Sequence, residues 1–205
     1  MSIPAPKSHE HDSDADQHLI MFNVPWSGYE AQLALRGEHS VPRVSYLDGA
    51  MELMSPSYTH ERVNSNIGRL VEAFLRESGI EYQPVGSWTL KSEAMAAGAE
   101  PDECYVFGDV APEPEPERPD LAIEVVRTHG GLNKLEIYRR LGVTEVWFWR
   151  KGTITVHVLR GERYEQAPRS QHLPELDLPL LTTFLDRAPV SRAIREYVQA
   201  LRAKR

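Results

Sequence analysis

Three acidic residues and one lysine between residues 101 and 150 have the side chains best suited to chemistry. Asp120 and Glu124 belong to the segment RPDLAIEVV, whose other residues are mainly apolar, and Asp102 precedes the apolar run CYVF. A carboxylate inside an apolar strand costs free energy unless a partner compensates it. Mg²⁺ prefers carboxylate oxygens, and two of them with water and a substrate phosphate suffice to bind it. These acids therefore suggest a Mg²⁺ site that could activate water against a phosphodiester.

Spacing along the strand separates the acids. Asp120 and Glu124 share one face but lie four residues apart, which is roughly 13 Å at about 3.3 Å per residue. One ion is not easily held by both. Asp102 becomes the natural partner of Glu124 if residues 104–107 pair with residues 119–126 across the acidic, proline-rich loop between them. We therefore predict Asp102 and Glu124 as metal ligands, with Mg²⁺, or Mn²⁺ in its place, as the cofactor.

Lys134 lies in the first turn of a helix predicted over residues 132–141. From there its ammonium could reach the end of the strand and orient water or stabilise a pentavalent phosphate. A cation near a helix N-terminus is unfavourable for the helix dipole, which makes this position unusual. On pattern alone, a surface lysine explains Lys134 equally well. For Glu124 the alternative is a structural ion pair with Lys134 or Arg127.

The elements that must position these residues form a strand, helix, strand unit, which implies a parallel pair of strands with a right-handed crossover. A tight hairpin is predicted over residues 41–54 around Asp48-Gly49, and an amphipathic helix over residues 63–74 ends near Gly79. We also expect a helix capped by Ser27, strands at 80–83 and 85–90, a loop over 91–101, a hairpin over 153–165, and C-terminal helices at 180–185 and 191–203.

The bulk properties favour one domain, residues 19–205, after a disordered polar tail over residues 1–18. We expect His9, His11 and His18 to be solvated in that tail rather than to bind metal. The net charge of −7 argues against bulk electrostatic coating of nucleic acid, but it is compatible with a nuclease that has a local basic rim. No signal peptide or membrane span is recognised, so a cytoplasmic location and no membrane partner are expected.

Several other residues favour structural roles. The single cysteine, Cys104, lies beside acids that disfavour a thiolate, so we do not expect a nucleophile. His60 shares the apolar face of the long helix, which favours a packed or capping histidine over a catalytic one, and Glu61 lies at its flank. Trp147 and Trp149 lie in an apolar strand and are expected in the core rather than as base-stacking platforms.

The segments EPDECYVF, RPDLAIEVV, GLNKLEIYRRLGV and EVWFWR, in this order, resemble the Uma-two family of endonucleases. This family is a branch of the PD-(D/E)XK restriction-endonuclease-like superfamily, and the resemblance extends from about residue 26 to about residue 185. It implies an α/β fold with a mixed central sheet flanked by helices and a Mg²⁺-dependent phosphodiesterase centre. Pro101-Asp102 matches the PD motif, Glu124 the second acid, and Lys134 the lysine.

One departure from the superfamily pattern concerns the lysine, which usually follows the acid by two residues, where this chain has Val126. In proteins similar to Uma-two the lysine has moved to the next helix, as Lys134 has here. The resemblance thus implies a Mg²⁺-dependent endonuclease that hydrolyses DNA, and superfamily members are often homodimers. The alternative is a catalytically inactive nuclease-fold protein with a binding or regulatory role.

Overall fold

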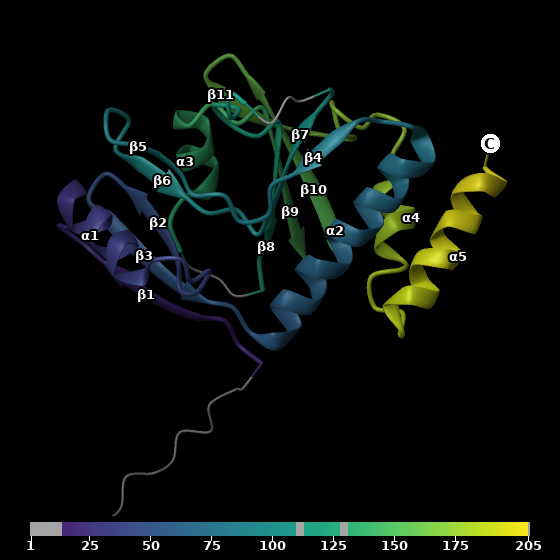
Figure 1. The fold of residues 1–205 in the computed structure, drawn as a ribbon, viewed down its shortest axis with the longest axis horizontal. Coiled ribbons are helices and arrows are strands. Elements are labelled where there is room, and N and C mark those ends of the chain that lie inside the picture. Colours follow the sequence, from purple (N-terminus) through teal and green to yellow (C-terminus); the bar gives the residue numbers. More distant parts are fainter. Residues whose placement is uncertain (1–13, 110–112, 128–130, 205) are drawn as a thin grey trace, which may run out of the picture.

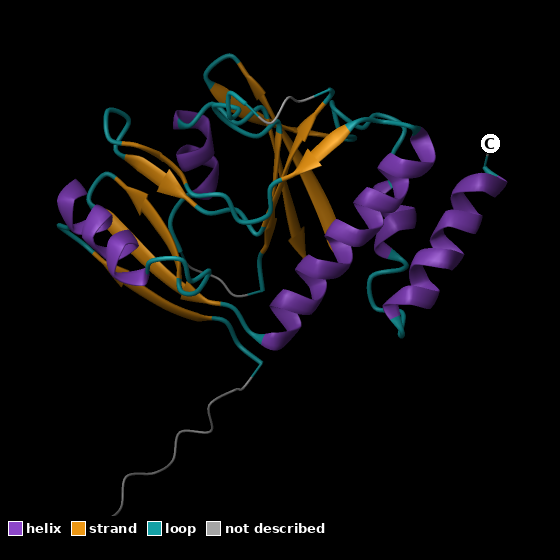
Figure 2. Cartoon of the chain, viewed as in Figure 1, coloured by secondary structure: helices purple, strands orange, loops and turns teal. Residues whose placement is uncertain are grey.

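The computed structural model describes residues 14–109, 113–127 and 131–204, which form two β-sheets and five helices (Figures 1 and 2). The helices are α1 (Trp26–Arg36), α2 (Tyr58–Ser78), α3 (Lys134–Arg140), α4 (Leu178–Thr182) and α5 (Val190–Ala203). The strands are β1 (Gln17–Met21), β2 (Arg43–Leu47), β3 (Ala50–Ser55), β4 (Tyr82–Pro84), β5 (Leu90–Ser92), β6 (Ala97–Ala99), β7 (Glu103–Phe107), β8 (Leu121–Val125), β9 (Glu145–Arg150), β10 (Thr153–Arg160) and β11 (Arg163–Ala167).

The larger sheet has the strand order β11-β10-β9-β8-β7-β4. Strands β7 and β8 pair antiparallel, with Glu103 opposite Ile123, while β8 and β9 pair parallel, with Ile123 opposite Trp147. Helix α3 connects the two parallel strands. The predicted hairpin across the acidic loop and the predicted strand, helix, strand unit are both confirmed, although residues 110–112 of that loop lie outside the described residues. The sheet is mixed, as expected for this α/β class.

Helix α2 runs along one face of the larger sheet, with α4 and α5 beside it (Figure 2). Ser57 caps α2 by accepting a hydrogen bond from the amide of His60 (3.2 Å), and Gly79 ends it in the left-handed conformation (φ 65°), as predicted. Its apolar stripe packs on the alternate residues of β8 that point to this face. The main core contains Ile67, Leu70 and Ile123, each at most 1% exposed, together with the fully buried Trp147. The expectation that the strand tryptophans belong to the core is confirmed.

The smaller sheet has the order β1-β3-β2-β6-β5 and carries α1 on its outer side (Figure 1). Asp48 and Gly49 form the predicted tight turn, both with positive φ (47° and 83°), between β2 and β3. Strand β1 pairs with β3 along its whole length. The prediction of a disordered tail over residues 1–18 is therefore wrong at its C-terminal end, since residues 17 and 18 belong to a strand. His9 and His11 lie outside the described residues.

Two further sequence-based expectations are corrected in this region. Residues 91–101 are not a loop throughout, because they contain β6, which pairs with β2. A Cβ at Gly98 of β6 would lie 2.3 Å from the hydroxyl of Tyr29, so α1 packs closely on this strand through a residue without a side chain. The strand expected at residues 85–90 is observed as β5, which is shorter and begins only at Leu90. Helix α1 begins after Pro25, which has no side-chain capping bond, so Ser27 is not its cap.

No helix in the described ranges is both long and apolar enough to cross a lipid bilayer.

Candidate active site

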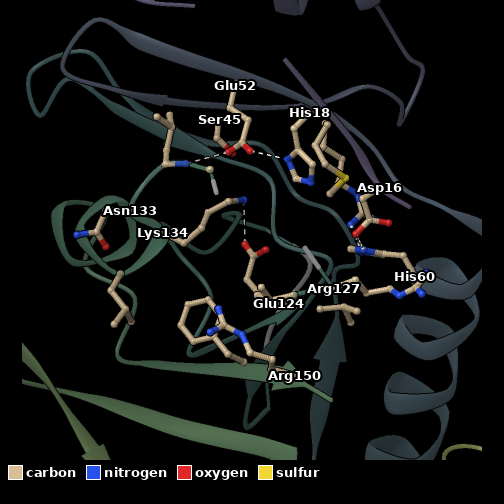
Figure 3. Close-up of a pocket in the computed structure, with 18 of the residues that line it drawn as sticks. Asp16, His18, Ser45, Glu52, His60, Glu124, Arg127, Asn133, Lys134 and Arg150 are labelled. Carbon is tan, nitrogen blue, oxygen red and sulfur yellow. Dashed lines mark hydrogen bonds and ion pairs between the residues drawn. The ribbon is translucent and has the colours of Figure 1, made fainter. Parts of the chain in front are cut away.

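A pocket of about 470 Å³ lies between the two sheets, beside the N-termini of α2 and α3 (Figure 3). Glu124 from β8 and Lys134 from α3 line one side of it. His18 from β1 and Glu52 from β3 line the opposite side. The pocket therefore places residues of both sheets around one cavity, and we describe its two walls in turn.

The β8–α3 wall consists of Glu124, Lys134 and Tyr138. Oε1 of Glu124 accepts hydrogen bonds from Nζ of Lys134 (3.1 Å) and from the hydroxyl of Tyr138. Its other oxygen, Oε2, makes no hydrogen bond or ion pair with any residue in the described ranges. Burial, together with the nearby negative charge of Glu124, raises the pKa of Tyr138 well above its usual value, so the phenol remains a donor. Glu124 thus has both donors on one oxygen and presents the other to the pocket.

Local structure explains how this wall is assembled. Alternation along β8 sends Leu121, Ile123 and Val125 into the core under α2, while Ala122 packs with Ile137 and Tyr138 of α3. Glu124 points to the same side as Ala122. Asn133 caps α3 by accepting from the amide of Glu136 (3.2 Å), which makes Lys134 the first residue of the helix. The capped helix start therefore holds Lys134 against Glu124.

Asp102 lies directly beside this wall. It precedes β7, its amide donates to the carbonyl of Ile123 (3.2 Å), and its Oδ2 accepts from the amide of Val125 (2.6 Å). Asp102 thus contacts the backbone on both sides of Glu124. The structure brings together all three residues that the sequence singles out as site residues: Glu124 lies on β8, Lys134 on α3, and Asp102 directly before β7.

The carboxylate of Asp102 is covered on its other side. Its Oδ1 contacts the guanidinium of Arg43 and lies 3.1 Å from Nε2 of His60. The Asp102 side chain is fully buried, and Asp102 is not among the residues that line the pocket. Arg43 also reaches Glu61 (3.0 Å), which places the predicted flanking acid in the same network. Asp102 is therefore neutralised by a cation of the protein in this arrangement.

The β1–β3 wall consists of His18 and Glu52. Nδ1 of His18 lies 2.7 Å from Oε1 of Glu52, and Oε2 of Glu52 accepts from the amide of Leu132 (3.2 Å). The hydrogen bond to Glu52 raises the pKa of His18, against the opposing effect of burial. Burial favours a higher pKa for Glu52, but the bond from His18 and the charge of Lys134 lower it overall. Both oxygens of Glu52 are therefore used to hold neighbouring parts of the chain.

A second histidine, His60, sits between two aspartates. Its Nδ1 lies 3.0 Å from Oδ2 of Asp16, its Nε2 faces Asp102, and the residue is 1% exposed. Burial disfavours a charged Asp16, but the contacts with His60 and with the amide of Ser57 outweigh it and lower the pKa of Asp16 to about 2. His60 is a packed histidine, as the sequence favours, and it also links the segment before β1 to Asp102.

Arginine side chains form a local basic rim. Arg43, Arg127 and Arg150 line the pocket together with Lys134. Arg127 is held by Asp14 (2.9 Å) and by the hydroxyl of Ser57 (2.8 Å), whereas Arg150 is exposed. The rim is compatible with a phosphate-containing ligand despite the net negative charge of the whole chain.

Other candidate residues lie away from the pocket. Asp120 accepts from the amide of Phe107 (2.8 Å) at the far end of β8, which agrees with its exclusion from the metal shell by spacing. Cys104 is buried, and burial raises the pKa of its thiol to about 12, so a thiolate nucleophile is disfavoured as predicted. Neither residue lines the pocket.

Sequence reasoning missed Asp16, His18, Arg43, Glu52 and Tyr138. Glu52 carried a usable signal, because it is an acid within the otherwise apolar strand AMELM, the same kind of anomaly that singles out Glu124. Tyr138 had no distinct signal, since an aromatic residue at helical spacing is most simply core. Asp16 and His18 were missed because residues 1–18 were predicted to be a disordered tail.

An α/β fold with a mixed sheet, and a strand and a following helix that place an acid and a lysine together, define the restriction-endonuclease-like class. Residues 26–188 match the Uma2 (Uma-two) family, described as "putative restriction endonuclease", so the chain belongs to that family. A crystal structure described as a "putative nuclease belonging to DUF820" from Anabaena variabilis shares the fold, with a TM-score of 0.50 and 14% identity, over 80% of this chain and 96% of that one. No curated protein matches the chain.

Proposed function

We propose that this protein is a Mg²⁺-dependent endonuclease that hydrolyses phosphodiester bonds of DNA at the pocket between the two sheets. The observation that carries the proposal is the Lys134–Glu124 pair, 3.1 Å apart at the pocket wall, with Asp102 bonded to the strand beside Glu124. Family membership supports a nuclease, and the arginine rim supports an anionic substrate.

The chemistry of the donor atoms fits Mg²⁺, with Glu124 available as it stands and Asp102 available once its contact with Arg43 loosens. Asp102 and Glu124 supply carboxylate oxygens, which are hard ligands, and Oε2 of Glu124 has no competing partner in the described part of the chain. No group of three or more His, Cys, Asp or Glu residues in the described ranges is arranged around one point, so the remaining positions would be taken by water and substrate oxygens. When bound, Mg²⁺ polarises the phosphate and lowers the barrier to attack by water.

The protein's own residues have separable roles in this proposal. Tyr138 and Lys134 hold Oε1 of Glu124, so that Oε2 points toward the pocket. Lys134 is also a charged donor that can bind a non-bridging phosphate oxygen whose negative charge grows during attack. Arg150 and Arg127 at the rim position the phosphates of the DNA strand that flank the bond to be cleaved.

One observation favours a second candidate, a nuclease-fold protein that binds a partner without catalysis. The contact of Arg43 with Asp102 places a cation where a metal ion would compete for the same carboxylate. Ligation by Asp102 requires this contact to loosen. Calorimetric titration with Mg²⁺ and Mn²⁺ separates the two candidates, because the binding-only protein should release no heat of ion binding at this site.

The decisive experiment is cleavage of supercoiled plasmid DNA with Mg²⁺, compared with EDTA, by the wild type and Glu124→Gln. We expect the variant to lose at least about 100-fold in rate, the scale of a lost transition-state contact, because one oxygen that would bind the ion becomes an amide. The fold should persist, since the remaining carbonyl can accept from Lys134 and Tyr138. Glu117→Gln, at an exposed carboxylate, is the matched control. Equal cleavage by both variants would refute the assignment of Glu124.

A further inference from the structure

The groups proposed to act on the phosphodiester lie well inside the pocket. The side chain of Glu124 is 6% exposed and that of Lys134 is 18% exposed. Both line a cavity of about 470 Å³, the size of pockets that take small organic ligands. The stack of paired bases in an intact duplex is far wider than such a cavity, whereas one unpaired nucleotide can enter it. Access to Glu124 therefore favours a strand whose nucleotides can leave the stack.

The lining of the pocket is not only charged. Met54 of β3, Leu135 of α3 and Phe148 of β9 contribute apolar side chains to it. A site that bound only phosphates and a metal ion would gain little from apolar groups, because phosphate oxygens bind through charged and polar donors. A nucleotide has both kinds of surface, a charged phosphate and the flat apolar face of its base. The mixed lining therefore matches a whole nucleotide.

Phe148 has a defined place beside Glu124. In the parallel pair of β8 and β9 the two residues lie directly opposite each other, so their strands hold them about 4.8 Å apart. Alternation along β9 directs Trp147 and Trp149 into the main core and Phe148 to the other face, where Glu124 points. Phe148 is half-buried and lines the pocket. An aromatic ring thus lies one strand away from the carboxylate that is proposed to bind the metal.

Neighbouring side chains hold this ring and extend the site. His157 of β10 packs against Phe148, with ring centroids 5.4 Å apart and ring planes at 80°. Burial lowers the pKa of His157, so the ring that makes this contact is neutral at neutral pH. Arg150 lies two residues beyond Phe148 on the same face of β9, is exposed and lines the pocket. Strand β9 thus presents an aromatic ring for a base and then a guanidinium for a phosphate.

We propose that the pocket takes up one unpaired nucleotide, with its phosphate at Glu124 and Lys134 and its base stacked on Phe148. This inference rests on the proposed function and narrows its substrate: single-stranded or locally opened DNA is cleaved in preference to an intact duplex. Every base has a flat face that can stack, so the preference is for unpaired nucleotides rather than for a sequence. A negatively supercoiled plasmid remains a substrate, because supercoiling favours local strand opening.

The first test is single-turnover cleavage, with Mg²⁺ and by the full chain, of a labelled DNA oligonucleotide that is either free or annealed to its complement. We expect the free strand to be cleaved at least about 10-fold faster, because a duplex must first break its pairing and stacking. Phe148→Leu keeps an apolar group but removes the aromatic face, and it should lose about 10-fold on the free strand. Phe148→Tyr should retain the wild-type rate. Phe107→Leu, at a half-buried phenylalanine that does not line the pocket, is the matched control.

The second test separates binding from catalysis. Fluorescence anisotropy, without added metal ion, compares a labelled oligothymidylate with a strand of the same length whose nucleotides are all abasic. The wild type should bind the oligothymidylate about 10-fold more tightly, and Phe148→Leu should reduce this ratio to about 2-fold or less. If Phe148 had only a structural role, its replacement would change both affinities equally and leave the ratio unchanged.

The outcomes distinguish this inference from the proposed function. Equal cleavage rates on the free and the annealed strand overturn the inference and leave the proposed function intact. Equal affinity of the wild type for the two labelled strands, or no measurable binding of either, also overturns it, as does a ratio unchanged in Phe148→Leu. Base-dependent binding that Phe148→Leu abolishes, without cleavage of any DNA, overturns the proposed function and retains the nucleotide site.

Discussion

The two walls of the pocket each carry a buried glutamate next to a basic side chain, but they use the carboxylate differently. On the β8–α3 wall, Lys134 and Tyr138 share Oε1 of Glu124, and Oε2 faces the pocket. On the β1–β3 wall, Glu52 uses Oε1 for His18 and Oε2 for the amide of Leu132. Glu124, with one oxygen available, can bind an ion in this arrangement, whereas Glu52, with both oxygens engaged, orients its neighbours. The oxygens of Asp102 are engaged as well, so Asp102 can bind an ion only once its contact with Arg43 loosens. We infer that burial of an acid alone does not separate these roles, and that the distribution of donors does.

The largest expected effect concerns Lys134, which belongs to the β8–α3 wall and is proposed to bind the substrate phosphate. Lys134→Met should lower the rate of Mg²⁺-dependent plasmid cleavage by about 100-fold or more, because a charged donor to the developing phosphate charge is lost. Single-turnover kinetics measure this change. Lys91→Met, which removes an exposed lysine paired with Glu30, should cleave like the wild type. A normal rate in Lys134→Met would make this residue a structural partner of Glu124 only.

The difference in available oxygens predicts different effects on metal binding. Glu124→Gln should weaken Mg²⁺ or Mn²⁺ binding by at least about 10-fold, since a ligand oxygen is replaced by an amide. Glu52→Gln should leave the affinity within about 2-fold. Isothermal calorimetry on the two variants measures both values. If Glu52→Gln weakened ion binding more than Glu124→Gln does, Glu52 rather than Glu124 would be the metal ligand.

The free energy of unfolding should change in the reverse order, more in Glu52→Gln than in Glu124→Gln. In Glu52→Gln the new amide group must face either Leu132 or His18. Facing the amide of Leu132 places two donors together, and facing His18 requires the ring to change tautomer and removes the charge that Glu52 supplies, so we expect a cost of about 1–3 kcal/mol. In Glu124→Gln the amide occupies the position of Oε2 and meets no donor from the described residues, so the free energy of unfolding should change by less than about 1 kcal/mol. Urea denaturation at neutral pH compares them, and equal losses would contradict the distinction.

The smallest expected effect is a pH dependence of the His18–Glu52 pair. Because the pKa of Glu52 is lowered in the folded protein, its contribution to the free energy of unfolding is present above its ordinary pKa of 4.5 and is lost as the pH falls. The raised pKa of His18 makes its contribution present below 6.5 and lost as the pH rises through the folded value. The stability difference between wild type and His18→Asn should therefore be largest between pH 4.5 and 6.5, at up to about 1 kcal/mol after solvent screening. Urea denaturation across this range measures it, and a difference that grows above pH 8 would contradict it.

The region around Glu124 was predictable because its signals are local. The apolar run of β8, the helical spacing of α3 and the Asp-Gly turn between β2 and β3 each depend on neighbouring residues in the chain. The resemblance in the same segments led to the family that residues 26–188 match. The placement of Asp102 beside Glu124 followed from one further assumption, the hairpin of β7 and β8, which the structure confirms.

The smaller sheet was harder to predict because its signals depend on distant partners. Strand β6 has the sequence AGA, which lacks the bulky residues typical of strands. Its glycine, Gly98, is explained by the close approach of Tyr29 from α1, and its two alanines pack with α3. Strand β1 begins in a polar segment, and it is ordered by pairing with β3 and by the contacts of Asp16 with His60 and Ser57. Local propensity does not encode such contacts.

The sequence by itself therefore determined the class of fold and the family, and it predicted that Asp102, Glu124 and Lys134 lie together. Only the tertiary structure decided which oxygen of each carboxylate has a partner and that Arg43 and His60 cover Asp102. It also brought His18 and Glu52 to the opposite side of the same pocket. The physical reason is that strand and helix periodicity place a side chain on a face, whereas hydrogen-bond partners across two sheets depend on how the sheets pack.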